Sequence, residues 1–207
     1  RETARIDRLI VAVDAFGFAG TRATEALTPM VDKLKARAGD VREELMAPQG
    51  LSVWGRAQRT LQPYEAWLTF RDWVEATNPR MAFSVARGLV LGAMIPESER
   101  RWASLMREEA RARLGYLLRP GTVLCMPTTP FAAPRCGLPL SELEPIRERI
   151  LCLCAHGGLA GFPQVSIPGA TIDGAPIGLS ILGPRGSDMN LASVATSIEP
   201  GTAINSR

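Results

Sequence analysis

The alternation of apolar and polar positions divides the chain into short strands and longer amphipathic helices. Period-two or continuous apolar runs bounded by glycine or proline predict strands, and apolar residues three and four apart predict helices that bury one face. The predicted strands are 6–15, 41–46, 122–126, 163–168 and 176–182. The predicted helices are 24–38, two segments within 51–94, 96–118, 142–155 and a last helix that ends near 198. This order indicates an α/β fold that forms one domain or one contiguous part of a larger domain.

Glycine and proline positions refine this pattern. Asp173 and Gly174 lie between the last two strands and favour a hairpin turn, because both residue types tolerate positive φ. Gly178, inside the second of these strands, predicts close approach by another backbone or side chain. Pro63 is expected to open a new helix within the 51–94 region, since proline suits a first helical turn.

The composition is that of an ordinary globular protein, with 46% hydrophobic residues, 22% charged residues and a net charge of +3. Basic residues are mixed with acidic ones, in expected helical pairs such as Glu97/Arg101 and Glu109/Arg113. This mixing argues against a nucleic-acid partner. No apolar run approaches the ~20 residues that span a bilayer, and no secretory signal is visible, so we expect a cytoplasmic protein without a membrane partner. The chain begins at Arg1 rather than Met, so we expect it to be processed or a fragment.

Few side chains could act as a general base. Lys33 and Lys35 are the only lysines, and His156 is the only histidine. The spacing Cys152-x-Cys154-x-His156 raises the question of a metal site or a cysteine nucleophile, but residues two apart on a helix point about 200° away from each other. We therefore expect no metal and no cofactor, and interpret His156 as a buried or pocket-edge residue. The four cysteines lie in apolar surroundings and are expected to be buried, reduced thiols.

Four segments in order closely resemble the C-terminal half of an amidase signature family enzyme. They are 51–73, containing LQPYEAW; 123–134, VLCMPTTPFAAP; 159–168, LAGFPQVSIP; and 174–184, GAPIGLSILGP. The resemblance covers the chain from about Arg8 to Ile198. It implies an α/β fold that is the C-terminal part of a mixed-sheet α/β/α architecture, with residues 1–198 in the amidase domain and 199–207 as a tail.

The resemblance also implies a chemistry. Enzymes of this family hydrolyse a carboxamide to a carboxylate and ammonia with a Ser–cis-Ser–Lys triad, and backbone N–H groups of a Gly/Ser-rich loop hold the oxyanion. This chain has no such loop and no lysine in an apolar context, so no catalytic residue can be carried over. We expect the chain to supply strands and one pocket wall, to need the N-terminal half of the same protein as a partner, and to be inactive alone.

Five residues are candidates for contact with a small-molecule amide substrate. The Pro127-to-Pro130 turn resembles a family loop beside the pocket, so Thr128, Thr129 and Phe131 are expected to line it, although a rigid proline loop without substrate contact is the alternative. Trp54 belongs to an aromatic-rich segment that suggests an apolar or aromatic amide, although a place in the core is the alternative for these aromatic residues. His156 precedes Gly158, which stands where the family often has asparagine, and this suggests a roomier pocket nearby.

Two classes of function therefore remain open from the sequence. One is an amidase of which this chain is part, and the other is a non-catalytic scaffold or interaction module derived from the same fold. The sequence leaves open whether the protein forms a homo-oligomer.

Overall fold

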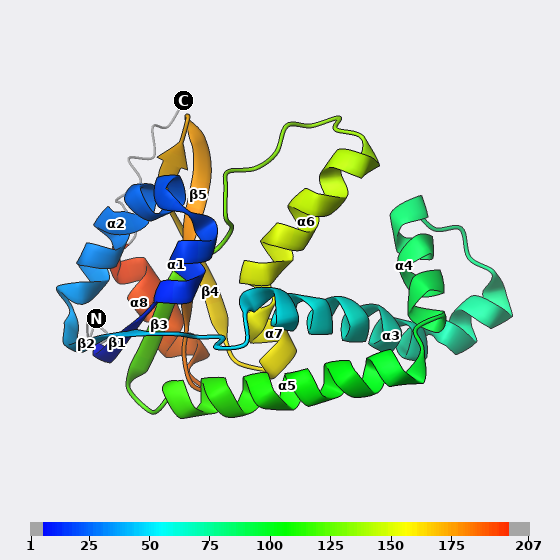
Figure 1. Cartoon of the computed structure of the whole chain (residues 1–207), viewed down its shortest axis with the longest axis horizontal. Helices are drawn as coiled ribbons and strands as arrows, with labels where there is room; N and C mark the ends of the chain where they lie inside the picture. The colour runs from blue at the N-terminus through cyan, green and yellow to red at the C-terminus, as the bar shows by residue number, and fades with distance from the viewer. Residues whose placement is uncertain (1–5, 199–207) are drawn as a thin grey trace.

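The computed structural model describes residues 6–198, which form a five-stranded mixed sheet with helices on both sides (Figure 1). The strands are β1 (Ile6–Ala12), β2 (Ala38–Glu44), β3 (Thr122–Pro127), β4 (Gln164–Ile172) and β5 (Ala175–Leu182). The helices are α1 (Val13–Ala19), α2 (Thr21–Lys35), α3 (Leu51–Thr77), α4 (Phe83–Ala93), α5 (Glu97–Leu117), α6 (Leu140–Cys154), α7 (His156–Ala160) and α8 (Asp188–Ile198). The predicted mixed-sheet α/β class is confirmed.

The strand order is β2-β1-β3-β5-β4. The first three of these run parallel to one another, whereas β3 and β5, and β5 and β4, are antiparallel pairs. All six residues of β3 are buried at the centre of the sheet. A strand covered on both faces is expected to be a continuous apolar run, as Val123 to Met126 are.

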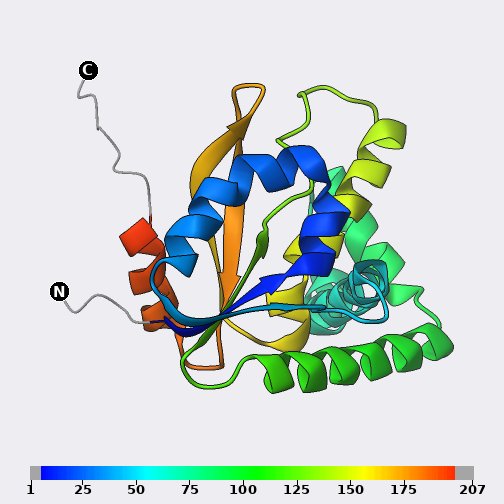
Figure 2. The same ribbon diagram turned by 60° about the vertical axis from the view of Figure 1, so that its left-hand side comes forward.

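The helices form two groups around the sheet, as Figure 2 shows. Helices α2 and α8 pack against one face, where they contact β4 and β5. Helices α3, α5, α6 and α7 lie on the other side. Helix α3 extends away from the sheet, and α4 crosses its far end (Figure 1). None of the helices in the described part is long and apolar enough to cross a membrane.

Several predicted boundaries are wrong. The helix predicted over 24–38 is α2, Thr21–Lys35, and the strand predicted over 41–46 is β2, Ala38–Glu44. The apolar run from Ile6 to Ala15 is a strand only as far as Ala12, and α1 follows directly; a short apolar run does not by itself distinguish a strand from a buried helix. Pro63 does not open a new helix but lies inside the continuous helix α3. A proline in a helix interior removes one N–H donor, a loss that the 27-residue helix tolerates.

The hairpin at the end of the sheet confirms its sequence signals. Asp173 and Gly174 have φ of 52° and 78°, as a type I′ turn requires. The predicted close approach at Gly178 is also present, because a Cβ there would lie 2.9 Å from Ser166 Oγ and 3.2 Å from Thr128 Oγ1. The absence of a side chain at Gly178 therefore leaves room for two hydroxyl groups.

Candidate functional site

A cavity of about 510 Å³ opens where the chain leaves the C-terminal end of β3. The predicted residues Thr128, Thr129 and Phe131 are in its wall. The remaining lining residues are Ala132, Ala133, Pro134, Ile150, Ser166, Pro168, Pro176, Ile177 and Gly178. The described part of the chain thus surrounds the cavity with apolar groups and hydroxyls, and places no ionisable side chain in its lining.

A chain of hydrogen bonds runs inward from this wall. Thr128 Oγ1 lies 2.8 Å from Ser166 Oγ and 2.9 Å from Ser180 Oγ. Gln164 Nε2 donates to Ser180 Oγ over 3.1 Å, and Gln164 Oε1 accepts from the backbone N–H of Gly157 over 3.2 Å. Ser180 is fully buried, whereas Ser166 is exposed at the cavity end of the chain. The wall hydroxyls are therefore held in place by a network anchored at α7.

Strand register brings these polar groups together. Ser166 of β4 is paired with Ser180 of β5, which is also paired with Met126 of β3. Thr128 follows two residues after Met126, and its backbone N–H donates to the carbonyl of Gly178 over 2.9 Å. Side chains two residues apart along a strand direction lie on the same face. Thr128 thus reaches the same face of the sheet as the two serines.

The loop after β3 is fixed by its own contacts. Thr129 Oγ1 donates to the carbonyl of Phe131 over 2.8 Å. The guanidinium of Arg149, on α6, lies 5.4 Å from the centre of the Phe131 ring and 5.8 Å from that of Phe18. Cation–π contacts at such distances are attractive. They hold Phe131 between α6 and α1 as part of the cavity wall.

Trp54 and His156 lie away from this cavity, in the core. Both are fully buried, and their rings meet edge to face at 5.4 Å between centroids. Trp54 Nε1 donates to Glu109 Oε2 over 2.6 Å, which ties α3 to α5. The predicted Glu109/Arg113 pair is therefore not formed: Arg113 reaches Glu44 at 3.4 Å instead, whereas the Glu97/Arg101 pair is present.

His156 is held in its neutral form. Burial lowers its pKa from the ordinary 6.5 to about 4, opposed by the Cys152 carbonyl and the negative charge of Asp14. Neither ring nitrogen makes a hydrogen bond to the described residues. With no exposed surface, this imidazole packs against Trp54 in the core.

The described residues offer no activated nucleophile. Lys33 and Lys35 are exposed in the last turn of α2. Burial raises the pKa of the Cys125 thiol to about 12 and also raises that of Cys152 and Cys154, so each stays a protonated thiol near neutral pH. Cys125 and Cys152 are buried as predicted, but the prediction is wrong for Cys136 and Cys154, whose residues are exposed. The described part contains no cluster of three or more His, Cys, Asp or Glu side chains that could hold a metal ion.

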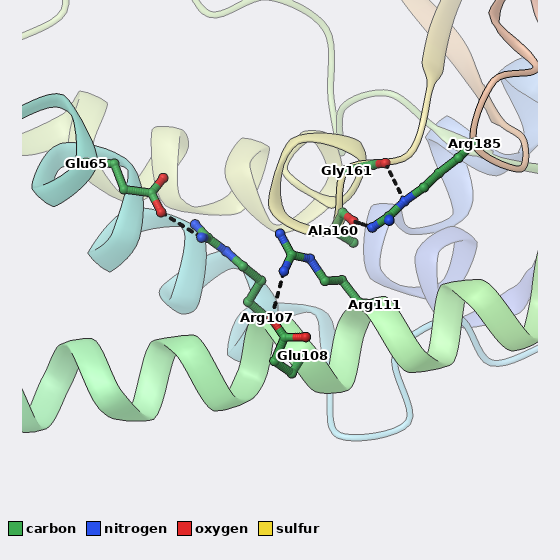
Figure 3. A network of polar contacts seen from close by, with 7 residues as sticks. All are labelled: Glu65, Arg107, Glu108, Arg111, Ala160, Gly161 and Arg185. Carbon is green, nitrogen blue, oxygen red and sulfur yellow. Dashed lines mark hydrogen bonds and ion pairs between the residues drawn. The ribbon is translucent and has the colours of Figure 1, made fainter. Parts of the chain in front are cut away.

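A second cavity, of about 740 Å³, lies near the opposite end of β3. Arg111 and Arg185 line it, and Figure 3 shows both within a network of polar contacts. Arg185 donates to the carbonyls of Ala160 and Gly161 over 3.0 and 3.1 Å. These bonds supply donors to carbonyl groups at the C-terminal end of the short helix α7. Arg111 pairs with Glu108 at 2.7 Å.

The same network joins two long helices. Arg107 of α5 pairs with Glu65 of α3 at 2.6 Å (Figure 3). Because the charged groups of this region are bonded to the fold itself, we assign the second cavity a structural role and take the cavity at Thr128 as the candidate site.

Three residues of the hydrogen-bonded network were not among the sequence candidates: Gln164, Ser166 and Ser180, of which Ser166 lines the cavity. Their only sequence signal was the alternation of polar with apolar residues in β4 and β5, which places Ser166 and Ser180 each at a polar position of its strand. That signal does not say which residues of the two strands face each other.

The chain is similar to known amidases over most of its length. The amidase family profile matches residues 56–192. Amidase 1 of Oryza sativa subsp. japonica is 29% identical over 152 residues, which are 73% of this chain and 35% of that protein. Translocon at the outer membrane of chloroplasts 64 of Pisum sativum is 24% identical over 162 residues, 78% of this chain and 27% of that protein.

A solved amidase shares the fold. Its crystal structure superposes with a TM-score of 0.73 at 24% sequence identity, over 95% of this chain and 46% of that one. The chain spans about a third of the length of the curated relatives it matches. The profile match over most of the chain, together with the shared fold, shows that this chain belongs to the amidase family.

Proposed function

We propose that this chain is the part of an amidase that forms one wall of the substrate pocket, for hydrolysis of a neutral carboxamide to a carboxylate and ammonia. The single observation that supports this most is the cavity at Thr128, whose lining combines hydroxyl groups with apolar groups. Thr128, Thr129 and Phe131 are the contact residues we assign. Trp54 and His156, being fully buried, support the fold.

The hydroxyl network suits an amide group. Each hydroxyl offers one donor and two acceptor lone pairs, and an uncharged carboxamide offers both kinds of group in return. Ser166, the exposed end of the network, is hydrogen-bonded to Thr128 among the residues that the structure describes. A charged substrate would meet no counter-charge in this lining, whereas an apolar acyl group would bury against Phe131, Ile150 and Ile177.

The nucleophile and base are proposed to lie outside this chain. Thr128 Oγ1 is within hydrogen-bonding distance of two hydroxyls, and neither of these partners is a basic group that could remove its proton. The partner that would complete the site is the N-terminal half of the same protein. β2 and β4 are the outer strands of the described sheet, and a longer sheet could continue from either of them.

A scaffold or interaction module remains the second candidate. The observation that favours it is the similarity to a relative whose name describes a component of a translocon rather than a hydrolase. We also propose a cytoplasmic location and the absence of a metal, a cofactor, a nucleic-acid partner and a membrane partner.

One experiment separates the two candidates. The complete reading frame that contains this chain is expressed, and ammonia release from phenylacetamide is measured for it and for the 207-residue chain alone. The amidase proposal expects turnover by the former and none by the latter. Absence of turnover by the complete protein with phenylacetamide and a panel of other neutral amides would favour the scaffold.

A matched pair of variants tests the assigned wall. Thr128→Val removes the central hydroxyl of the network, and we expect kcat/KM for phenylacetamide to fall by about tenfold or more, because a hydrogen bond of about 1–3 kcal/mol is lost. Thr196→Val makes the same change on exposed α8 and should leave kcat/KM unchanged. Equal effects of the two substitutions would contradict the assignment.

A further inference from the structure

The hydrogen-bond chain between α7 and the cavity at Thr128 has a direction that is set at its inner end. Gln164 Oε1 lies 3.2 Å from the backbone nitrogen of Gly157, and a backbone N–H can only donate. The amide oxygen of Gln164 therefore faces Gly157, and its Nε2 faces Ser180 Oγ at 3.1 Å. Because an amide NH2 group offers donors and no acceptor, Gln164 donates to Ser180.

Close packing holds the Gln164 side chain in this position. A Cβ on Gly157 would lie 2.8 Å from Gln164 Oε1 and 3.0 Å from Gln164 Cβ, so the side chain lies directly against the backbone of α7. An amide turned end for end would place its NH2 group against the N–H of Gly157, and two donors would then face each other without an acceptor. The orientation of Gln164 is thus fixed by a backbone group that cannot change its role.

The direction passes outward through two hydroxyl groups. Ser180 is fully buried and accepts from Gln164, so its own proton goes to Thr128 Oγ1, 2.9 Å away, rather than staying without an acceptor. The proton of Thr128 then goes to Ser166 Oγ, 2.8 Å away, which is the acceptor left for it among the described residues. Ser166 accepts from Thr128 and keeps its own O–H group free.

The free O–H group of Ser166 belongs to the cavity. Ser166 is exposed and lines the cavity, at the outer end of the chain of hydrogen bonds. A hydroxyl that accepts a hydrogen bond becomes a stronger donor, because the bonds of a chain polarise one another. The cavity wall therefore presents a polarised donor at this point, beside the apolar side chains of Ile177 and Phe131.

We propose that Gln164 is a positioning residue that directs the Ser166 O–H group into the cavity, where it donates to an uncharged carbonyl oxygen. This inference rests on the proposed function, since the carbonyl is that of a carboxamide only if the cavity is the amide pocket. The substrate then contacts this wall through its C=O group, and its NH2 group needs no partner there.

Gln164→Glu in the complete protein reverses the chain while keeping the shape of the side chain. The carboxylate accepts from both Gly157 and Ser180, so every hydroxyl turns and Ser166 offers only lone pairs to the cavity. Phenylacetone can only accept a hydrogen bond, whereas 2-phenylethanol can accept or donate. We expect the variant to weaken binding of phenylacetone about fivefold or more relative to 2-phenylethanol, measured by calorimetry without turnover.

Two further variants separate the relay from the added charge. Gln62→Glu introduces the same charge at an exposed position of α3 and should leave the ratio of the two dissociation constants unchanged. Thr128→Val interrupts the chain, so Gln164→Glu should have no effect on the ratio in that background, whereas a direct effect of charge would persist. An unchanged ratio in Gln164→Glu alone, or an equal change with Thr128→Val present, would overturn the proposal.

Neutron diffraction on crystals of the complete protein in D2O observes the direction without a ligand. We expect the deuterium between Thr128 and Ser166 to be bonded to Thr128 Oγ1. Deuterium bonded to Ser166 Oγ and pointing at Thr128 would overturn the proposal even if the protein hydrolyses amides. Absence of amide turnover, together with the expected deuterium position and ligand ratio, would contradict the proposed function and support the donor role of Ser166.

Discussion

Acidification should destabilise this chain through its one histidine. The pKa of His156 is lowered by burial from 6.5 to about 4. Between these values the unfolded chain binds a proton that the native chain does not, so the free energy of unfolding falls as the pH falls through this window. Each pKa unit corresponds to about 1.4 kcal/mol, so the full loss is about 3 kcal/mol, of which about 2 kcal/mol appears between about pH 7 and about pH 5.

Urea unfolding at the two pH values measures this loss directly. His156→Leu is the control, because leucine has a similar volume, carries no proton and replaces two ring nitrogens that lack hydrogen bonds to the described residues. An apolar replacement of such a group is expected to be nearly neutral near pH 7. The variant should lose about 2 kcal/mol less than the unmodified chain on acidification.

The proton itself can also be observed. A chain with a single histidine gives a single set of imidazole NMR signals, which should titrate near pH 4 in the folded state. Titration near pH 6.5 with the native fold intact would refute the reasoning, as would a His156→Leu variant with the same pH-dependent loss as the unmodified chain.

Two further predictions concern helix packing. Gly92→Ala should lower the free energy of unfolding in urea by about 1–3 kcal/mol, because the added Cβ would meet the Pro63 carbonyl. Gly88→Ala, on the same helix but with open space around it, should raise the free energy of unfolding by about 0.5–1 kcal/mol. The reverse order of stabilities would contradict the packing of α4. Trp54→Phe should lower the free energy of unfolding by about 1–3 kcal/mol, because Glu109 loses its hydrogen bond from the indole N–H. Thermal or urea unfolding measures this loss, and an unchanged stability would contradict a role for the hydrogen bond.

The hairpin illustrates how far the sequence predicts this site. The Asp173-Gly174 turn and close packing at Gly178 followed from residue type alone. A regular two-residue hairpin would pair Ser166 with Ile181, judging from the pair Ile172 and Ala175 beside the turn. A bulge between Pro168 and Ala170, where Gly169 has φ of 147°, shifts the register by one residue. Ser166 then faces Ser180, and the hydroxyl network depends on this shift.

Long-range contacts account for the other differences. Pro63 has the local properties of a helix start, but α4 rests on its carbonyl at Gly92, and such packing can override a local preference. The Glu109/Arg113 spacing suits a surface pair, yet the indole of Trp54, 55 residues earlier, takes Glu109 as its acceptor. Segment type follows from local pattern, whereas partner choice follows from which elements the fold brings together.

The wall function can be tested most directly by filling the cavity at Thr128. Ala133→Trp, in the complete protein, inserts an indole at the cavity lining, and Ala192→Trp makes the same change at an exposed position of α8. We predict that Ala133→Trp raises KM for phenylacetamide by about tenfold or more and affects acetamide much less, since only the larger acyl group needs the filled space. An unchanged KM for phenylacetamide, or the same increase with Ala192→Trp, would contradict the proposal that this chain forms a wall of the substrate pocket.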